Sequence, residues 1–115
     1  MIELWLPYPP SANNLWRSAR GRTYRSRTYT DWLLEAGLLA KQCLKEPIKG
    51  PYKLSITAAR PDKRKRDLDN LLKPISDLLT SIGAIEDDHL CEMLTARWVT
   101  VGDGVAVRLE AAGIE

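Results

Sequence analysis

Apolar side chains recur along this chain with two different spacings, and the order of these spacings limits the fold more than any other feature. Residues 2–6 and 52–59 alternate apolar and polar side chains, as a strand covered on one face does. Residues 28–46 and 68–82 carry apolar side chains every three or four positions, the period of an amphipathic helix. Residues 90–101 and 105–111 again indicate strands, joined by Gly102-Asp103-Gly104, a good tight-turn sequence.

The order strand, helix, strand, helix, strand, strand predicts an α/β fold with a small mixed β-sheet and two helices packed on it. The last two strands are expected to pair as a C-terminal antiparallel hairpin. A length of 115 residues fits one domain over residues 1–115. Residues 11–27 are polar and rich in arginine, which predicts an irregular loop that is functional or mobile.

Composition favours a globular, cytoplasmic protein that does not enter a membrane. Hydrophobic residues make up 44% of the chain, yet no segment approaches the ~18 consecutive apolar residues that span a bilayer. The first residues lack the basic flank and apolar run of a signal peptide. Cys43 and Cys91 are expected to be reduced and buried, and the single His89 excludes most histidine-rich metal sites.

The charges are distributed unevenly, and this points to a polyanionic partner. Residues 1–66 hold 14 Lys/Arg and 5 Asp/Glu, a balance of +9, and residues 67–115 hold 3 and 10, a balance of −7, which together give +2. Two basic clusters stand out, and the first contains no acid and is interleaved with tyrosines. Their members are Arg17, Arg20, Arg22, Arg25 and Arg27, then Arg60, Lys63, Arg64, Lys65 and Arg66. Such clusters favour a nucleic acid partner over a merely solvated surface.

Two aspartates follow the second basic cluster directly, at the expected start of the second helix. Asp67 is placed to cap that helix, and Asp69 lies in the first turn, where negative charge is favoured. The same oxygen donors also suit Mg²⁺ or Mn²⁺, which bind carboxylates together with substrate phosphate. Pro74, within the predicted helix, is unusual because proline removes a backbone hydrogen bond.

Two further acidic features extend this region. Asp69, Lys73 and Asp77 are four residues apart and share one helical face, either as surface salt bridges or with Lys73 beside a carboxylate site that faces a phosphate. The loop after the helix contains Asp87 and Asp88. For Asp88 to approach Asp67, the chain would have to double back, as a strand antiparallel to the helix would allow.

At these positions the chain resembles the RusA family of Holliday-junction resolvases. The resemblance is carried by the run Arg64-Lys65-Arg66-Asp67-Leu68-Asp69-Asn70-Leu71 with Lys73, Gly83 and Asp87-Asp88, and by the opening Leu6-Pro7-Tyr8-Pro9-Pro10-Ser11-Ala12-Asn13-Asn14 and Gly21-Arg22-Thr23. It implies one RusA-like nuclease domain that forms a homodimer and makes paired symmetric nicks in four-way DNA junctions with Mg²⁺, Mn²⁺ being possible.

The resemblance also implies roles for individual residues. The metal-binding acids correspond to Asp67, Asp69 and Asp88, and the catalytic lysine corresponds to Lys73. Asp87 stays open as a second ligand or neighbour, and Asp77 matches a family aspartate without an assigned role. The residues expected to bind branched DNA are Asn13, Asn14, Arg17, Arg20, Arg22, Arg25, Lys63, Arg64, Lys65 and Arg66.

Two other functions remain open from the residues alone. One is a non-catalytic or inactive protein that binds branched DNA, in which the aspartates only cap and pair. The other is a metal-dependent nuclease for other branched DNA. Any surface between two copies is expected on an apolar face of helix 28–46.

Overall fold

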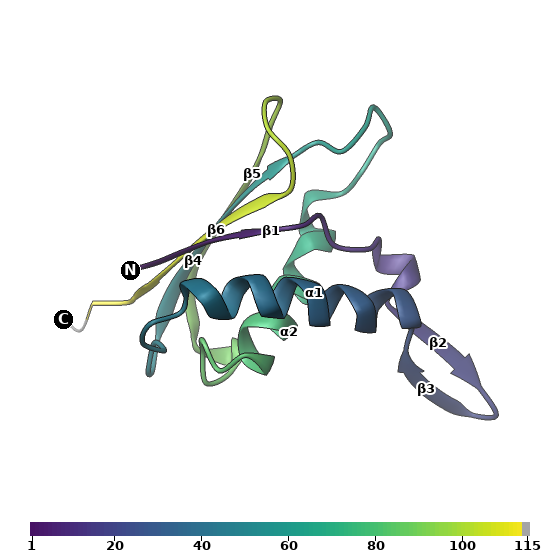
Figure 1. The fold of residues 1–115 in the computed structure, drawn as a ribbon, viewed down its shortest axis with the longest axis horizontal. Helices are drawn as coiled ribbons and strands as arrows, with labels where there is room; N and C mark the ends of the chain where they lie inside the picture. The colour runs from purple at the N-terminus through teal and green to yellow at the C-terminus, as the bar shows by residue number, and fades with distance from the viewer. Residues whose placement is uncertain (114–115) are drawn as a thin grey trace.

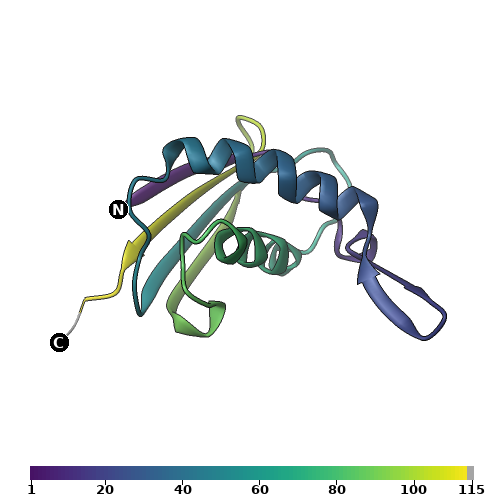
Figure 2. The same cartoon turned by 60° about the horizontal axis from the view of Figure 1, so that its bottom comes forward.

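A four-stranded mixed sheet, covered on one face by two helices, makes up the body of the protein (Figures 1 and 2). The computed structural model describes residues 1–113. The sheet has the order β1-β6-β4-β5, formed by β1 (Ile2–Leu6), β6 (Val105–Ala111), β4 (Tyr52–Ala59) and β5 (Cys91–Val99). The helices are α1 (Arg27–Cys43) and α2 (Leu72–Ser81). The α/β fold with a mixed sheet and two packed helices is therefore confirmed.

The alternating strands bury one side of the sheet under the helices. In β4 the side chains of Leu54, Ile56 and Ala58 are buried, and those between them are half-exposed. β6 alternates in the same way from Val105 to Leu109. This alternation places the core between the sheet and the two helices, since neighbouring residues of a strand face opposite sides.

The predicted hairpin of the last two strands is wrong. β5 and β6 run antiparallel, but β4 lies between them, parallel to β5 and antiparallel to β6. The connection of residues 100–104 passes the end of β4, where Ala59 N–H donates to Gly104 O at 3.0 Å and Arg60 N–H donates to Val99 O at 3.2 Å. The largely buried β4 takes the central position, because its apolar residues gain most from being covered.

Gly104 is required where this connection lies against the end of β1. Its φ is +70°, and an added Cβ would lie 2.5 Å from the carbonyl oxygen of Leu6. The indole N–H of Trp5 donates to Asp103 O at 2.8 Å and fixes the loop on the end of β1. Gly104 therefore permits a close approach of this connection to the end of β1, and does not form the tight turn of a hairpin.

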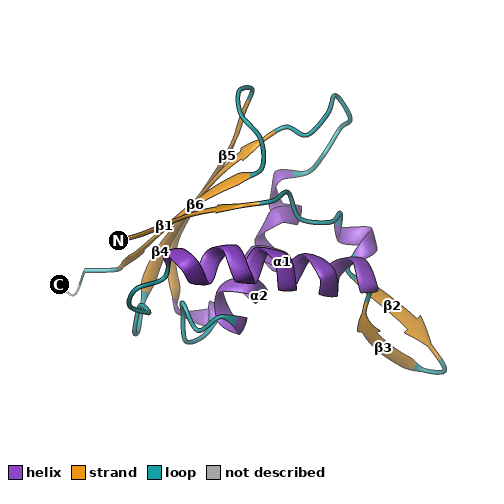
Figure 3. Cartoon of the chain, in the orientation of Figure 1, coloured by secondary structure: helices purple, strands orange, loops and turns teal. Residues whose placement is uncertain are grey.

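Residues 11–27 are more ordered than the predicted irregular loop. A short 3₁₀ turn, η1 (Ala12–Asn14), is followed by the antiparallel pair β2 (Trp16–Ala19) and β3 (Arg22–Arg25). Arg20 and Gly21 connect the strands with φ values of 54° and 75°. Positive φ at both central residues is typical of a hairpin turn that matches strand twist. The hairpin projects from the body beside the start of α1 (Figure 3).

Helix α1 begins at Arg27, one residue before the predicted range of 28–46, and is capped by Ser26. The Ser26 hydroxyl accepts a hydrogen bond from Tyr29 N–H at 3.0 Å. Tyr29 and Trp32 are buried, whereas Cys43 is exposed, contrary to its expected burial. Within residues 1–113, neither this helix nor the other is long and apolar enough to cross a membrane.

The predicted helix of residues 68–82 is divided in two. The 3₁₀ segment η2 (Leu68–Leu71) precedes α2, which begins at Leu72. Pro74 therefore lies in the first turn of the α-helix, where backbone N–H groups have no intrahelical partner and none is lost. Helix α2 connects the parallel strands β4 and β5, and the 3₁₀ segment η3 (Asp88–Leu90) leads into β5.

Candidate active site

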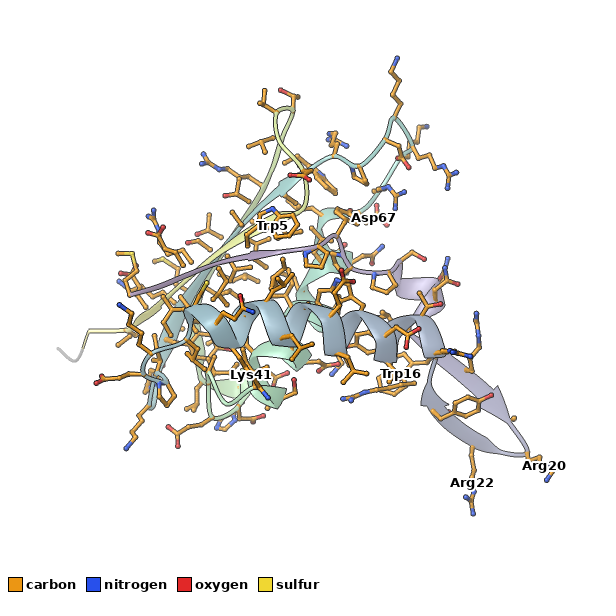
Figure 4. The ribbon with its side chains drawn as sticks, in the orientation of Figure 1. Trp5, Trp16, Arg20, Arg22, Lys41 and Asp67 are labelled. Carbon is orange, nitrogen blue, oxygen red and sulfur yellow. The ribbon has the colours of Figure 1, made fainter. Side chains whose placement is uncertain are left out.

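Asp67 lies beside a shallow cavity where the basic loop enters η2. The cavity has a volume of about 250 Å³. Its lining includes Tyr8, Asn13, Lys65, Arg66, Asp67 and Asn70. In Figure 4, Asp67 lies over the body of the domain, whereas Arg20 and Arg22 lie at the far end of the hairpin. The structure thus brings one of the predicted metal ligands together with two predicted DNA-binding cations.

The two aspartates at the start of η2 are not used for capping. Asp67 occupies the N-cap position, but its side chain makes no capping hydrogen bond. Asp67 and Asp69 are both exposed, and neither forms a salt bridge with a residue in the described part of the chain. Both carboxylates therefore keep their oxygen lone pairs available, and such oxygens suit a hard divalent cation.

Lys73 is held by Asp77 and not by Asp69. The Lys73 ammonium lies 3.1 Å from Asp77 Oδ1, and the hydroxyl of buried Tyr29 donates to Asp77 Oδ2 at 2.6 Å. Burial, reinforced by this hydrogen bond, raises the pKa of Tyr29 well above its ordinary value. Asp77, whose role the sequence left open, thus connects an exposed lysine at the start of α2 with the core under α1.

Asp88 lies at the other end of the second helix. It begins η3, which packs against α2 just before β5 starts. The expected antiparallel course of β5 and α2 is present, but Asp88 precedes this strand. The residues that lie level with the start of α2 are therefore the last ones of β5, at the far end of the strand from Asp88. β5 is about 26 Å long, since a strand rises about 3.3 Å per residue.

No metal cluster forms within one copy of the chain as described. Among residues 1–113, no three His, Cys, Asp or Glu side chains are placed to hold an ion together. Asp87 contacts the His89 ring, and this hydrogen bond lowers the pKa of the Asp87 carboxyl. Asp67 and Asp69 supply fitting oxygen donors, but Asp88 and Asp87 do not join them in a single chain.

The basic loop of residues 60–66 is anchored by aromatic rings that sequence analysis missed. The Tyr8 and Trp98 rings are stacked with centroids 6.4 Å apart. The Arg60 guanidinium lies 4.7 Å from the Trp98 ring centroid, and Arg66 lies 5.6 Å from that of Tyr8. Cations over aromatic faces are attracted by the ring electrons. The stack connects the proline-rich segment after β1 with the end of β5 and with both ends of the loop. These residues are far apart in the sequence, so no local sequence pattern predicts the contact.

One ion pair completes the anchoring of this loop. The Arg66 guanidinium lies 2.7 Å from an Asp62 carboxylate oxygen, and this contact lowers the pKa of Asp62 to about 2. Lys63 and Lys65 are exposed, and so is Arg64, which lies 3.8 Å from Asp62. Of the four predicted DNA-binding cations in the loop, Arg66 is therefore held most closely by internal contacts, with Asp62 and with the Tyr8 ring.

The hairpin carries its arginines on two faces. The register pairs Arg17 with Tyr24 and Ala19 with Arg22, so Arg17, Arg22 and Tyr24 share one face. Arg25 pairs with Trp16 on the other face and lies 5.7 Å from the Tyr29 ring centroid. All eight strand residues are exposed, and in the described chain no carboxylate pairs with these arginines or with Arg20.

The two asparagines before the hairpin have different surroundings. Asn13 is exposed and lines the cavity beside Asp67. The backbone carbonyl of Asn14 accepts a hydrogen bond from the Ser26 hydroxyl, which connects η1 to the start of α1. The predicted phosphate contact is therefore better placed at Asn13, and Asn14 serves the turn through its backbone.

Together, fold and site define a class: small α/β proteins that set unpaired carboxylates among basic side chains on a polyanion-binding surface. The model of the family described as Endodeoxyribonuclease RusA matches residues 7–110. A crossover junction endodeoxyribonuclease RusA from Escherichia coli strain K12 is 41% identical over 89 residues, covering 75% of this chain and 72% of that protein. The protein of that name from Enterobacteria phage 82 matches with the same identity and coverage. This chain belongs to the RusA family.

Proposed function

We propose that this protein is a divalent-metal-dependent endodeoxyribonuclease that resolves four-way DNA junctions by paired symmetric nicks. The observation that carries the proposal is the pair of unpaired carboxylates, Asp67 and Asp69, at the start of η2, where Asp67 lines the same cavity as the cations Lys65 and Arg66. Carboxylates next to a basic surface oppose a DNA backbone unless a cation joins them. The relatives named crossover junction endodeoxyribonuclease support the same chemistry. We further propose that residues 1–115 form one nuclease domain that acts as a cytoplasmic homodimer.

Mg²⁺ is the ion we propose for the site, with Mn²⁺ as a substitute. Asp67 and Asp69 would bind it through carboxylate oxygens, and we assign Asp88 as the third ligand. When bound, such an ion polarises a phosphodiester and lowers the pKa of a water. The residues of the chain contribute the position of the phosphate, because Lys65 and Arg66 lie on the same cavity as Asp67.

Lys73 is proposed to stabilise the negative charge that develops on the scissile phosphate. Its ammonium is directed by Asp77, which is itself fixed by Tyr29. A held cation costs less reorganisation when charge develops than a freely rotating one. Asp77 is accordingly a positioning residue.

DNA binding is assigned to both basic regions. Arg17, Arg20, Arg22 and Arg25 of the hairpin and Lys63, Arg64 and Lys65 of the loop would contact phosphates, together with Asn13 and Arg66 at the cavity. Asn14, which the sequence also assigned to DNA, is proposed only as a secondary contact from the adjacent 3₁₀ turn. A two-stranded ribbon fits the major groove of B-DNA, and arginine and lysine supply most phosphate contacts. Contacts of this kind position the duplex without reading its sequence.

The test is cleavage of a four-way junction labelled on each strand, with linear duplex beside it, in Mg²⁺ or in EDTA. We expect paired nicks at symmetric positions in the junction alone. Asp67→Asn and Asp69→Asn should each reduce the rate by more than about 100-fold, the order expected when one transition-state stabilising group is lost. Both variants should keep or increase junction affinity, because negative charge near the phosphates is removed.

Asp103→Asn is the matched control, since Asp103 is an exposed aspartate in the loop between β5 and β6. It should cleave at the wild-type rate. Junction binding without cleavage in any metal would contradict the proposal and favour a non-catalytic binding protein. Equal cleavage of flaps or linear duplex would retain the metal chemistry and refute junction specificity.

A further inference from the structure

An apolar groove lies between α1 and the end of α2. Its volume is about 360 Å³. Leu34 and Leu38 line it and are 65% and 67% exposed. Exposed apolar side chains that lie together mark surfaces for other proteins, whereas scattered single ones are ordinary. Apart from Arg25, none of the residues that line this groove belongs to the proposed metal site or to the proposed DNA contacts.

Gly37 lines the groove where α1 meets α2. An added Cβ at this position would lie 3.5 Å from Ile82 Cγ2 and 3.7 Å from Leu78 Cδ1, and these are ordinary contact distances. Alanine would therefore fit there, and it favours a helix more than glycine does. The packing of the two helices does not require the glycine, and what the glycine provides is room in the groove.

The groove has a cation at each end. The Arg25 guanidinium lies 5.7 Å from the Tyr29 ring centroid near the start of α1, and Lys41 extends from the last turn of α1 (Figure 4). Within residues 1–113, no acidic side chain lines the groove and no salt bridge holds either cation. A molecule that lies along the groove thus meets apolar side chains at its centre and positive charge at both ends.

We infer that this groove binds a short acidic segment of another protein, whose apolar side chains cover Leu34 and Leu38 and whose carboxylates meet Arg25 and Lys41. From Thr30 to Lys41 the helix rises about 17 Å, which matches about five residues of extended chain or three turns of a helix. Amphipathic segments bind apolar grooves through side chains spaced to fit them. The inference goes beyond the proposed nuclease function and does not depend on it.

The charges oppose two other occupants of the groove. A second copy bound through the same face would be related by a two-fold axis, which sets the cations of one copy against those of the other. A DNA backbone would meet the cations but would place charged phosphates against the leucines, which gain only from apolar cover. We therefore assign to a different protein the face of α1 that the sequence pattern assigned to a second copy.

Selection from a library of random 12-residue peptides, displayed on phage and panned on the immobilised full chain, tests the inference. The enriched peptides should combine apolar side chains with two or more Asp or Glu. An enriched peptide labelled with fluorescein then reports affinity by anisotropy. Leu38→Ser should weaken its binding by about 10-fold, because one leucine loses its cover. Lys41→Glu should weaken it by about 5-fold, and by less at high salt.

Matched controls lie outside the groove. Val101→Ser changes an apolar residue that is 83% exposed, and Lys45→Glu reverses an exposed lysine just after α1. Both variants should bind the peptide like the wild type. Gly37→Ala should raise the midpoint of thermal unfolding and weaken peptide binding, since it adds a methyl group to the groove. Unchanged peptide binding in both Gly37→Ala and Leu38→Ser would overturn the inference.

Other outcomes would also refute the groove as a site for an acidic segment. These are a selection that enriches no peptide, enriched peptides without acids, and binding that is lost in Arg17→Ala with Arg22→Ala but kept in Leu38→Ser. A change of oligomeric state in Leu38→Ser, measured by sedimentation velocity, would assign the groove to a second copy. Junction cleavage by Leu38→Ser and Lys41→Glu should equal that of the wild type, so the proposed nuclease function and this inference can fail separately.

Discussion

The two basic regions of this protein have similar compositions and opposite relations to the fold. The loop of residues 60–66 is fixed at both ends, with Arg60 over Trp98 and Arg66 between Asp62 and Tyr8. The hairpin of residues 16–25 stands away from the body, and its four arginines have no acidic partner in the part of the chain that the structure describes.

This difference teaches that charge alone does not assign a role. An anchored cation has a defined position relative to the carboxylates beside it, and this suits a group that places one phosphate for reaction. A projecting ribbon suits contacts with DNA far from the proposed site, which would add affinity without fixing the reacting atoms. We therefore expect changes in the loop to affect the rate and changes in the hairpin to affect binding.

The largest effect expected from the hairpin comes from Arg17→Ala combined with Arg22→Ala. The affinity for junctions at low salt should fall by about 100-fold, and the slope of log affinity against log salt should become shallower by about 2. The cleavage rate at saturating DNA should not change. Salt-dependent fluorescence anisotropy with single-turnover cleavage measures both quantities.

The control for this variant is Ser18→Ala combined with Thr23→Ala, which alters the opposite face of the same ribbon. It should bind like the wild type. The arginine variant would contradict the proposed difference between the two basic regions if its cleavage rate at saturating DNA fell while its affinity for junctions stayed unchanged.

The next effect concerns Tyr29, at which the base of the hairpin meets the body. Tyr29→Phe removes the hydroxyl that donates to Asp77, and the free energy of unfolding should decrease by about 2 kcal/mol, as for a hydrogen bond to a charged group. The rate of cleavage should also fall, because Asp77 then holds Lys73 less firmly. Urea unfolding and single-turnover cleavage test the two parts.

Tyr24→Phe is the comparison for this change, since Tyr24 is a half-exposed tyrosine of the hairpin. It should leave stability unchanged. A stable Tyr29→Phe protein that cleaves normally would show that Asp77 does not position Lys73.

A smaller effect is expected when the anchoring of the loop is weakened. Tyr8→Leu keeps an apolar side chain but removes the ring between Trp98 and Arg66, and should cost about 1 kcal/mol of stability. Limited proteolysis should then cut within residues 60–66 sooner than in the wild type, and the cleavage rate should fall more than junction affinity. Unchanged proteolysis would mean that the stack does not hold the loop.

The smallest effect concerns pH and the core. The Tyr52 hydroxyl is buried and has no hydrogen-bond partner among the described residues, and burial raises its pKa to about 12. Because the unfolded chain ionises near pH 10, the stability due to neutral Tyr52 is complete below pH 10 and is lost as the pH rises toward 12.

Tyr52→Phe should therefore equal or slightly exceed the wild type in stability at pH 7, and should lose less stability between pH 9 and pH 11. Thermal unfolding at these three pH values measures the difference. A clear destabilisation of the Tyr52→Phe variant at pH 7 would contradict this prediction, because it would mean that the Tyr52 hydroxyl makes a hydrogen bond in the folded protein.

Several parts of the fold follow from local pattern. The bounds of β1, β4 and β6 coincide with the predicted strands, because alternation along a half-buried strand is a strong signal. The hairpin of residues 16–25 could have been found from Arg20-Gly21 between two short runs with tyrosine, threonine and tryptophan, but its exposed strands have no apolar face to mark them. The 3₁₀ start of the second helix places Pro74 where it costs nothing, which the apolar spacing alone could not indicate.

By itself the sequence determined the elements, their order, the two basic clusters and the motif that identifies the family. The spacing of apolar residues, capping chemistry and charge are properties of neighbouring residues, so they can be predicted from the sequence. Only the tertiary structure decided that β4 separates β5 from β6, that Tyr8 and Trp98 hold the basic loop, and that Asp88 lies a strand's length from Asp67. Each of these depends on which distant segments share the core, a choice made by the total burial of apolar surface and not by any local pattern.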